Sequence, residues 1–442
     1  MSQAAIEPRR FLDGLAAFRS TGPVAEPSWL TLRRQQAQAR FDDEGLPSPS
    51  DEGWRQTNLA SLAATTFAPL AIPPRVEIAP ALASAPWGSL GFRRLVTING
   101  VFDRSLSDDL TQVGLRCGGL AELINSQPGL LEASLATIAE AKAQPFAALN
   151  TALFRDGVAI IAADGFTLRD PIQIVHFVTC GPGAFASHPR TLVVAGRGAQ
   201  IGVVEIFIAL TEATLLTNAV TEVHADEAAR VDFLRIQDEP RQGFHLGRFA
   251  ARAGRNGRIS AFSASLGATL TRNDASVLLD GEGAQVALDG LYALTGRQHC
   301  DNHTTLDHAQ PHGASHESYR GVLDGQATAV FSGRIIVRPH AQKTDAIQRN
   351  GNLLLSKEAT VHTRPQLEIY ANDVKCTHGA TIGMLNREAL FYLQSRGIGA
   401  HDARQILVEA YLAEIVPEST PGSVRAALLA RVSELISHEV LP

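Results

Sequence analysis

The chain has 442 residues, of which 45% are hydrophobic and 19% are charged, and its formal net charge is −6. This length is too great for one compact core of ordinary proportions, so we expect two or three domains or one elongated repeat architecture. The composition excludes a disordered chain, and the modest charge indicates neither a nucleic acid nor a membrane surface as a partner.

Three features of the sequence predict a cytoplasmic protein. The first ten residues, MSQAAIEPRR, contain no apolar segment of the kind that a secretory signal needs. The most apolar stretch, 191–210, is about long enough to span a bilayer, but polar residues interrupt it and its valines and isoleucines favour buried strands. The cysteines lie far apart without a CxxC pair, which is typical of free thiols in a reducing compartment: Cys117, Cys180, Cys300 and Cys376.

Residues 1–145 are predicted to form a largely helical N-terminal region. Phe11, Leu15 and Phe18 have the spacing of a helix face. Proline and glycine break helices at 45–54 and again at 68–80, where we expect a linker. Further along the region we expect a hairpin around Asn99 and Gly100 and a helix over 131–144.

Residues 146–383 are predicted to form a parallel β-helix core. From about Asp156, short strand-like runs alternate with glycine and small acidic turns, and one phrase of turn, small residue and strand recurs. Spacings of 30, 28, 27, 44 and 31 residues separate its anchors, which are Ile201, Val231, Ile259, Val286, Val330 and Val361. Stacked coils explain this near-fixed spacing better than a β-propeller, which expects longer spacings and a motif in every blade.

Residues 384–442 are predicted to form a small unit of three helices. Asn386 is suited to cap the first helix, and Gly397 to end it. The second helix is expected to present one apolar face made of Ala403, Ile406, Leu407, Ala410, Tyr411 and Ile415. The third, from Ser423 to about His438, carries Val424, Leu428, Val432 and Leu435. We expect this unit to cap the solenoid or to dock a partner.

The densest group of histidines lies within 299–316 and suggests a metal site, and hence a zinc enzyme. It comprises His299, Cys300, His303, His308, His312 and His316. On a strand, however, His299 and His303 point to the opposite side from Cys300, and no HExxH or CxxC pattern is present. The alternative is a polar ladder in which Asn and His side chains bond between coils and to turn backbone.

A second candidate site lies in the segment VKCTHG, residues 374–379. Cys376 and His378 fall on one face of an extended strand, so a thiolate and an imidazole could both reach one iron ion. Two ligands make an incomplete site, and the others would come from elsewhere. The alternative is that Cys376 simply faces the core, since free cysteine is often buried.

Common catalytic signatures are missing from the sequence. It contains no GxxxxGK[ST] phosphate loop, so nucleotide hydrolysis would require a partner, and no GxSxG or GxGxxG motif in the required context. Acidic residues of the core are expected in solvated turns, and none of them stands out as a catalytic pair for glycoside chemistry: Asp226, Glu227, Asp280, Glu282 and Asp324. We therefore expect a protein that is not an enzyme.

Four stretches of the chain resemble the SufB/SufD family of iron–sulfur cluster assembly proteins. The VKCTHG wording is similar to the SufD branch, because the SufB branch carries a GHEAT-like phrase there. The resemblance is strongest over 291–416. The four stretches are 51–59 (DEGWRQTNL), 146–174, 301–356 and 368–398.

This resemblance implies a right-handed parallel β-helix flanked by helical regions. It also implies two partners: a SufB-like protein paired through the β-helices, and a SufC-like ABC-type ATPase docked on the C-terminal helices around Phe391–Gln394 and His401–Tyr411. ATP would then bind to the ATPase and not to this chain. Transient iron or a nascent cluster would lie at the interface with the SufB-like protein, near His378 and Cys376.

Other interpretations of the whole chain stay open at this point. The chain could be the SufB-like scaffold itself, or a β-solenoid polysaccharide lyase or hydrolase, since that fold often carries such enzymes. The enzyme alternative predicts a groove along the solenoid lined by carboxylates or arginines. The isolated chain could also form a homodimer through the surface meant for its partner.

Overall fold

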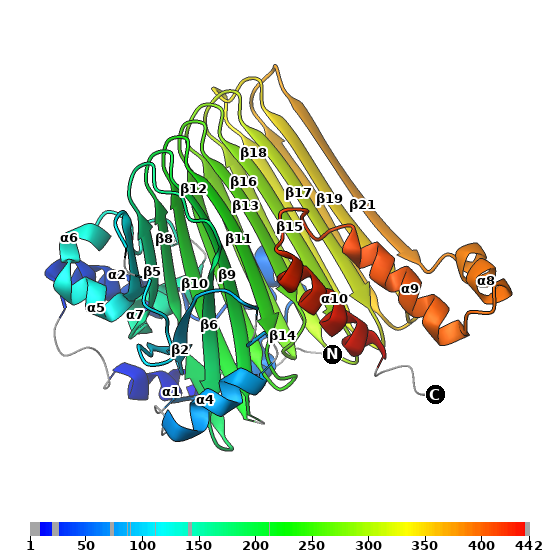
Figure 1. The fold of residues 1–442 in the computed structure, drawn as a ribbon, viewed down its shortest axis with the longest axis horizontal. Helices are drawn as coiled ribbons and strands as arrows, with labels where there is room; N and C mark the ends of the chain where they lie inside the picture. Colours follow the sequence, from blue (N-terminus) through cyan, green and yellow to red (C-terminus); the bar gives the residue numbers. More distant parts are fainter. Residues whose placement is uncertain are drawn as a thin grey trace.

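The computed structural model describes residues 9–19, 26–70, 75–85, 87–88, 90–110, 112–139, 144–211 and 213–437. Within these ranges the chain is a parallel β-solenoid of about eight turns with helices at both ends (Figure 1). The predicted fold is therefore confirmed. No helix in the described ranges is long and apolar enough to cross a membrane.

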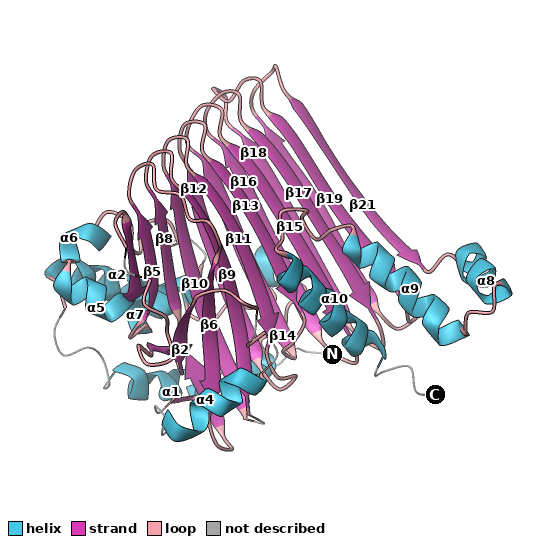
Figure 2. Cartoon of the chain, in the orientation of Figure 1, coloured by secondary structure: helices cyan, strands magenta, loops and turns pink. Residues whose placement is uncertain are grey.

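The described strands form two sheets, and the coils pass from one sheet to the other (Figure 2). Sheet A contains β4 (Leu115–Gly119), β5 (Gly157–Ala162), β8 (Arg190–Ala195), β10 (Thr214–Ala225), β12 (Phe244–Ala253), β14 (Leu270–Leu279), β16 (His299–His308), β18 (Thr328–Val337) and β20 (Thr360–Ile369), with β1 (Ala68–Pro69) and β7 (Ala184–Ser187) at one side. Sheet B contains β3 (Val101–Phe102), β2 (Arg94–Ile98), β6 (Ile172–Thr179), β9 (Gln200–Leu210), β11 (Arg230–Asp238), β13 (Arg258–Ser265), β15 (Gln285–Leu294), β17 (Ala314–Leu323), β19 (Asp345–Leu354) and β21 (Lys375–Met384).

The predicted repeat matches single coils over its first part only. Ile201, Val231, Ile259 and Val286 are successive register partners in sheet B.

The next two anchors belong to the other sheet. Val286 pairs with Ser315, so the spacing of 44 to Val330 is not one coil. Val330 lies in sheet A and pairs with His362, one residue beyond the predicted Val361. The anchors change sheet because each coil contains two strands, and a tight turn precedes both of them. The same sequence phrase therefore occurs before strands of both sheets.

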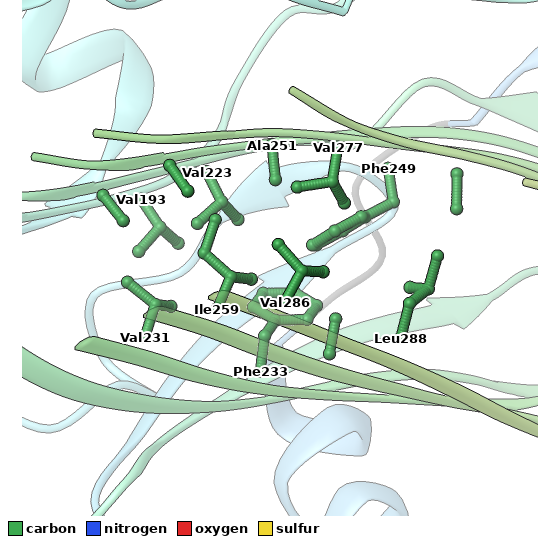
Figure 3. Close-up of a cluster of buried hydrophobic side chains, with 14 of the residues drawn as sticks. Val193, Val223, Val231, Phe233, Phe249, Ala251, Ile259, Val277, Val286 and Leu288 are labelled. Carbon is green, nitrogen blue, oxygen red and sulfur yellow. The ribbon is translucent and has the colours of Figure 1, made fainter. Parts of the chain in front are cut away.

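The core fills the bore between the two sheets with inward-pointing side chains. Every second residue of a strand points inward, and Figure 3 shows the two inner faces meeting. Sheet A contributes Val193, Val223, Phe249, Ala251 and Val277, and sheet B contributes Val231, Phe233, Ile259, Val286 and Leu288. β-Branched side chains are frequent here because they fit a pleated, buried surface.

Most helices of the N-terminal region pack around the first coils, but the 3₁₀ helix also reaches the last coil, where Glu52 forms an ion pair with Arg364 of β20 at 2.6 Å. The helices of this region are α1 (Arg9–Arg19), α2 (Ser28–Glu44), the 3₁₀ helix η1 (Glu52–Trp54), α3 (Ala60–Ala63), α4 (Arg75–Ser84), α5 (Leu120–Ser126), α6 (Pro128–Leu131) and α7 (Pro145–Leu153). The hairpin at Asn99 and Gly100 is confirmed, since both residues have positive φ between the antiparallel β2 and β3. β2 and β4 belong to the solenoid sheets, and the domain boundaries at 145 and 383 stay predictions.

The prediction of a helix over 131–144 is wrong for the residues that the structure describes. Residues 132–139 form turns, and 140–143 lie outside the described residues. The backbone N–H groups of Ala136, Thr137, Ile138 and Ala139 donate to the carboxylate of Glu222 at 2.6–3.1 Å. These donors satisfy a buried carboxylate that also pairs with Arg190, and this tertiary requirement outweighs the local helix propensity.

The three C-terminal helices are α8 (Arg387–Ser395), α9 (Ala400–Ala413) and α10 (Gly422–Ser437). α9 and α10 lie against the outer face of sheet B, whereas α8 projects beyond it (Figure 1). The Asn386 cap is confirmed, because its side-chain oxygen accepts the N–H groups of Glu388 and Ala389 at 2.9 and 3.1 Å. The apolar residues Val424, Leu428, Val432 and Leu435 of α10 are buried.

The predicted inner face of α9 is partly wrong. Ile406 is 44% exposed and Ala410 is also exposed, whereas Val408 and Leu412 are buried. The stripe is rotated because α9 contacts both β17 and α10, so its buried side is set by two neighbours at once.

Candidate functional site

The last coil leaves one end of the solenoid open. β20 pairs with β18 and β21 pairs with β19, and neither has a second neighbour among the described strands. The far edges of both strands therefore present free backbone N–H and C=O groups, which are able to pair with another chain. In Figure 1 this end lies beside α8.

Apolar side chains are exposed along this open end. Ile369 is 40% exposed, Tyr370 61%, Ile382 50% and Met384 56%. Apolar side chains next to unpaired strand edges are typical of a surface that another β-structure covers.

The two predicted site residues lie on the inward face of β21. Their register partners on β19 are Ala346 for Cys376 and Gln348 for His378, and both partners are fully buried in the bore. The predicted shared face is therefore confirmed. Cys376 is half-buried and packs against the central core, whereas His378 is exposed because no further coil covers it.

The electrostatic surroundings of Cys376 favour a protonated thiol. Burial is the main cause that raises its pKa, and the nearby carboxylate of Asp345 raises it further. Because the thiolate is the metal-binding form, these surroundings disfavour Cys376 as a ligand in the isolated chain.

Cys376 and His378 by themselves would make an incomplete metal site. Across the described ranges, no group of three or more His, Cys, Asp or Glu side chains is arranged to hold a metal ion. A soft or borderline metal at His378 and Cys376 would therefore need further ligands from beyond the described residues.

The histidine-rich segment 299–316 is divided between several surfaces. His299 and His303 point outward from sheet A, while Cys300 and His308 point into the bore. His312 lies in a turn with positive φ. The described residues of this segment form no metal site, so the structure does not support the zinc-enzyme hypothesis.

The same segment takes part in the expected polar ladder. Asn273 donates to Asn302 across neighbouring strands at 3.0 Å. His308 bonds to the hydroxyl of Ser315 at 2.9 Å, and burial lowers its pKa to about 4, which keeps it neutral. Outside the bore, Asp301 accepts a hydrogen bond from Arg272 at 2.7 Å. These side chains hold the coils together.

A shallow groove of about 430 Å³ lies on the outer face of sheet B. Arg230, Asp232, Arg258 and Asp345 contribute to its lining, and Arg230 already pairs with Asp232 at 3.1 Å. The acidic residues expected in turns lie at coil corners, where Glu227 and Asp280 form ion pairs at the surface. Asp324 is an exception to the predicted solvated positions, because it is mostly buried and pairs with Arg404 of α9 at 3.2 Å.

Two buried residues behind His378 were not predicted from the sequence. Glu317 and Gln348 occupy the same inward position on β17 and β19 that His378 occupies on β21. Aligning the coils by their turns places the strings ASHES, DAIQR and KCTHG in register, and this signal could have found them.

Two family models match the chain. The model described as "SUF system FeS cluster assembly, SufBD core domain" matches residues 177–411, and the "SufBD protein N-terminal region" matches residues 24–174. This chain belongs to the SufBD family of iron–sulfur cluster assembly proteins. That membership sets aside the polysaccharide lyase or hydrolase alternative.

Two curated relatives are similar over nearly the whole chain, and a third over about half of it. The chain is 30% identical to the iron–sulfur cluster assembly protein SufD of Escherichia coli, over 91% of this chain and 93% of the relative. It is 32% identical to a SufBD family protein of Synechocystis, slr0076, over 92% and 91% of the two chains. A chloroplastic protein of Arabidopsis thaliana, ABCI7, is 33% identical over 54% of this chain and 51% of the relative.

Proposed function

We propose that this chain is the SufD-type, non-catalytic subunit of a SufBCD-type scaffold that assembles iron–sulfur clusters in the cytoplasm. The observation that carries the proposal is the open solenoid end, where free strand edges, exposed apolar side chains and His378 lie together. The absence of CxxC pairs and the four unpaired cysteines are in keeping with a reducing compartment.

The first partner is a SufB-like β-helix that pairs with β20 and β21. Such a partner would complete the backbone hydrogen bonds of both edges and would cover the exposed side chains of Tyr370 and Met384. When no partner is present, a second copy of this chain could use the same edges, which gives the homodimer alternative.

The second partner is a SufC-like ABC-type ATPase that docks on the C-terminal helices. Support comes from α8, which projects from the body and exposes Phe391 by 72% and Tyr392 by 57%. α8 is also linked to the body through α9, whose residue Tyr411 accepts a hydrogen bond from Arg320 of β17 at 2.8 Å through its backbone oxygen. ATP binds to that partner, since this chain contains no phosphate loop.

The cargo is iron or a nascent cluster held between the two β-helices. His378 would offer an imidazole nitrogen, and Cys376 a thiolate once the partner changes its surroundings. The partner would supply the remaining ligands, because the described part of this chain has none nearby.

Co-expression with SufB-like and SufC-like proteins tests the proposed assembly. All three chains should co-purify as one complex, and failure of this chain to join it would contradict the proposal. A complex in which this chain replaces the SufB-like protein would favour the alternative that it is the scaffold itself.

His378→Ala tests the proposed site. The variant should fold and join the complex but form little or no cluster, measured by iron and sulfide content and by visible absorption. Thr377→Ala is the matched control, since Thr377 is the outward-pointing neighbour on the same strand and should leave cluster formation unchanged. A fully active His378→Ala complex would overturn the proposed role.

A further inference from the structure

Three inward-pointing residues form a continuous ladder that ends at the open mouth of the bore. Glu317 pairs in register with Gln348, and Gln348 pairs with His378, on the neighbouring strands β17, β19 and β21. Neighbouring strands lie about 4.8 Å apart, so side chains in register on one face stack directly on each other. Glu317 and Gln348 are fully buried, and His378 is the exposed end of the ladder.

The amide of Gln348 is held in one orientation. Its Nε2 atom donates a hydrogen bond of 2.7 Å to Oε2 of Glu317. On the opposite side of the bore, a Cβ atom at Gly333 would collide with the same Nε2 atom, so the absence of a side chain there makes room for the amide. With its nitrogen fixed on Glu317, Gln348 has its oxygen available for another partner.

That oxygen is buried and unused. Oε1 of Gln348 has no hydrogen-bond partner in the described part of the chain. A buried acceptor without a partner costs about 1–3 kcal/mol, so a nearby donor is strongly favoured. The ring of His378, its register neighbour on the adjacent strand, makes no hydrogen bond with any described residue and is exposed.

We propose that Gln348 is a positioning residue for His378, whose ring N–H donates to the side-chain oxygen of Gln348. This bond holds the proton on one ring nitrogen and leaves the lone pair of the other nitrogen directed to the open mouth. Histidines that bind metals commonly donate their second ring nitrogen to such an acceptor, which fixes both tautomer and orientation. The inference rests on the proposed role of His378.

The hydrogen bond can be measured without any metal, by NMR of the full chain with ¹⁵N-labelled histidine at pH 8. The His378 signals are identified by their loss in His378→Ala. In the wild type the two ring nitrogens should give the well-separated shifts of a single tautomer. In Gln348→Met the two shifts should move toward each other, because the acceptor that holds one tautomer is gone.

Three further variants make the measurement specific. Gln348→Glu keeps an oxygen acceptor and should retain the wild-type pattern. Thr363→Val is the matched control, since Thr363 also has a buried, unbonded hydroxyl near the mouth but lies on β20 in the opposite sheet. If Gln348→Met does not fold, Gly333→Ala displaces the amide from across the bore and should shift the His378 signals in the same way.

A functional readout separates this inference from the proposed function. In the assembled complex, Gln348→Met should slow cluster formation roughly 10- to 100-fold, the usual effect of losing a residue that orients a metal ligand. Unchanged ring signals in Gln348→Met would overturn the inference even if His378→Ala abolishes cluster formation. A fully active His378→Ala complex would overturn the proposed function whatever the ring signals show.

Discussion

Two buried glutamates in the bore, one near each end, show how differently the same fold treats a carboxylate. Glu205 lies on β9 among the first coils, and both its oxygens are bonded: Thr221 donates at 3.1 Å and Arg235 at 2.9 Å. Glu317 lies on β17 near the open end, and its bonded neighbour is the neutral amide of Gln348. Both side chains are fully buried.

The pKa values of these two groups move in opposite directions. Burial by itself would raise the pKa of Glu205, but Arg235 and His176 outweigh burial and hold that pKa at about 2. Burial raises the pKa of Glu317 to about 7, because the hydrogen bond from Gln348 and the charge of nearby His316 offset only a small part of the effect of burial. The first coils therefore use their polar groups for stability, while the last coils carry a destabilised carboxylate behind the candidate site.

The largest expected effect on stability is in the first coils, around Glu205. Arg235→Met leaves Glu205 buried without its cation and should lower the free energy of unfolding by about 3–5 kcal/mol, measured by denaturant titration. The matched control is Arg197→Met, because Arg197 and Asp164 form a solvent-exposed pair whose loss should change the stability little. Equal losses of stability in the two variants would contradict the view that Arg235 stabilises a buried carboxylate.

The second effect is the pH dependence at the open end. The folded chain keeps the proton of Glu317 up to about pH 7, whereas the unfolded chain loses it near 4.5. Its contribution to stability is therefore complete below pH 4.5 and is lost as the pH rises through 7, by about 3 kcal/mol in total. As the pH rises between these values, the free energy of unfolding of Glu317→Gln should therefore increase by this amount relative to that of the wild type.

The difference in stability between Glu205→Gln and the wild type should change with pH in the opposite direction. The folded pKa of Glu205 is about 2, so its contribution is complete above pH 4.5 and is lost as the pH falls toward 2. Denaturant titrations of both variants and the wild type across pH measure these differences. A pH-independent difference for Glu317→Gln would contradict the assignment of a raised pKa.

The smallest expected effect on stability is at the exposed end of the ladder. His378→Ala should lower the free energy of unfolding by only about 1 kcal/mol, because the side chain is exposed and the one interaction lost is the hydrogen bond proposed with Gln348. Thermal and denaturant unfolding of the isolated chain measure this. A large loss of stability would mean that His378 has a structural role and would weaken its assignment as a site residue.

Local sequence patterns predicted much of the fold and half of the candidate site. The turn phrase that recurs every 27–30 residues from Ile201 to Val286 indicated coils, and strand alternation placed Cys376 and His378 on one face. The glutamine behind His378 was missed because it lies 30 residues earlier in the chain, and only the register of the coils brings the two side chains together.

The sequence by itself determined the features that depend on neighbouring residues. The Asn386 cap, the hairpin at Asn99 and the inward and outward faces of each strand follow from local geometry that a few residues specify. Only the tertiary structure decided where buried charges find partners. Residues 136–139 turn around Glu222 in place of a helix because a buried carboxylate must be satisfied by whichever donors the fold brings to it.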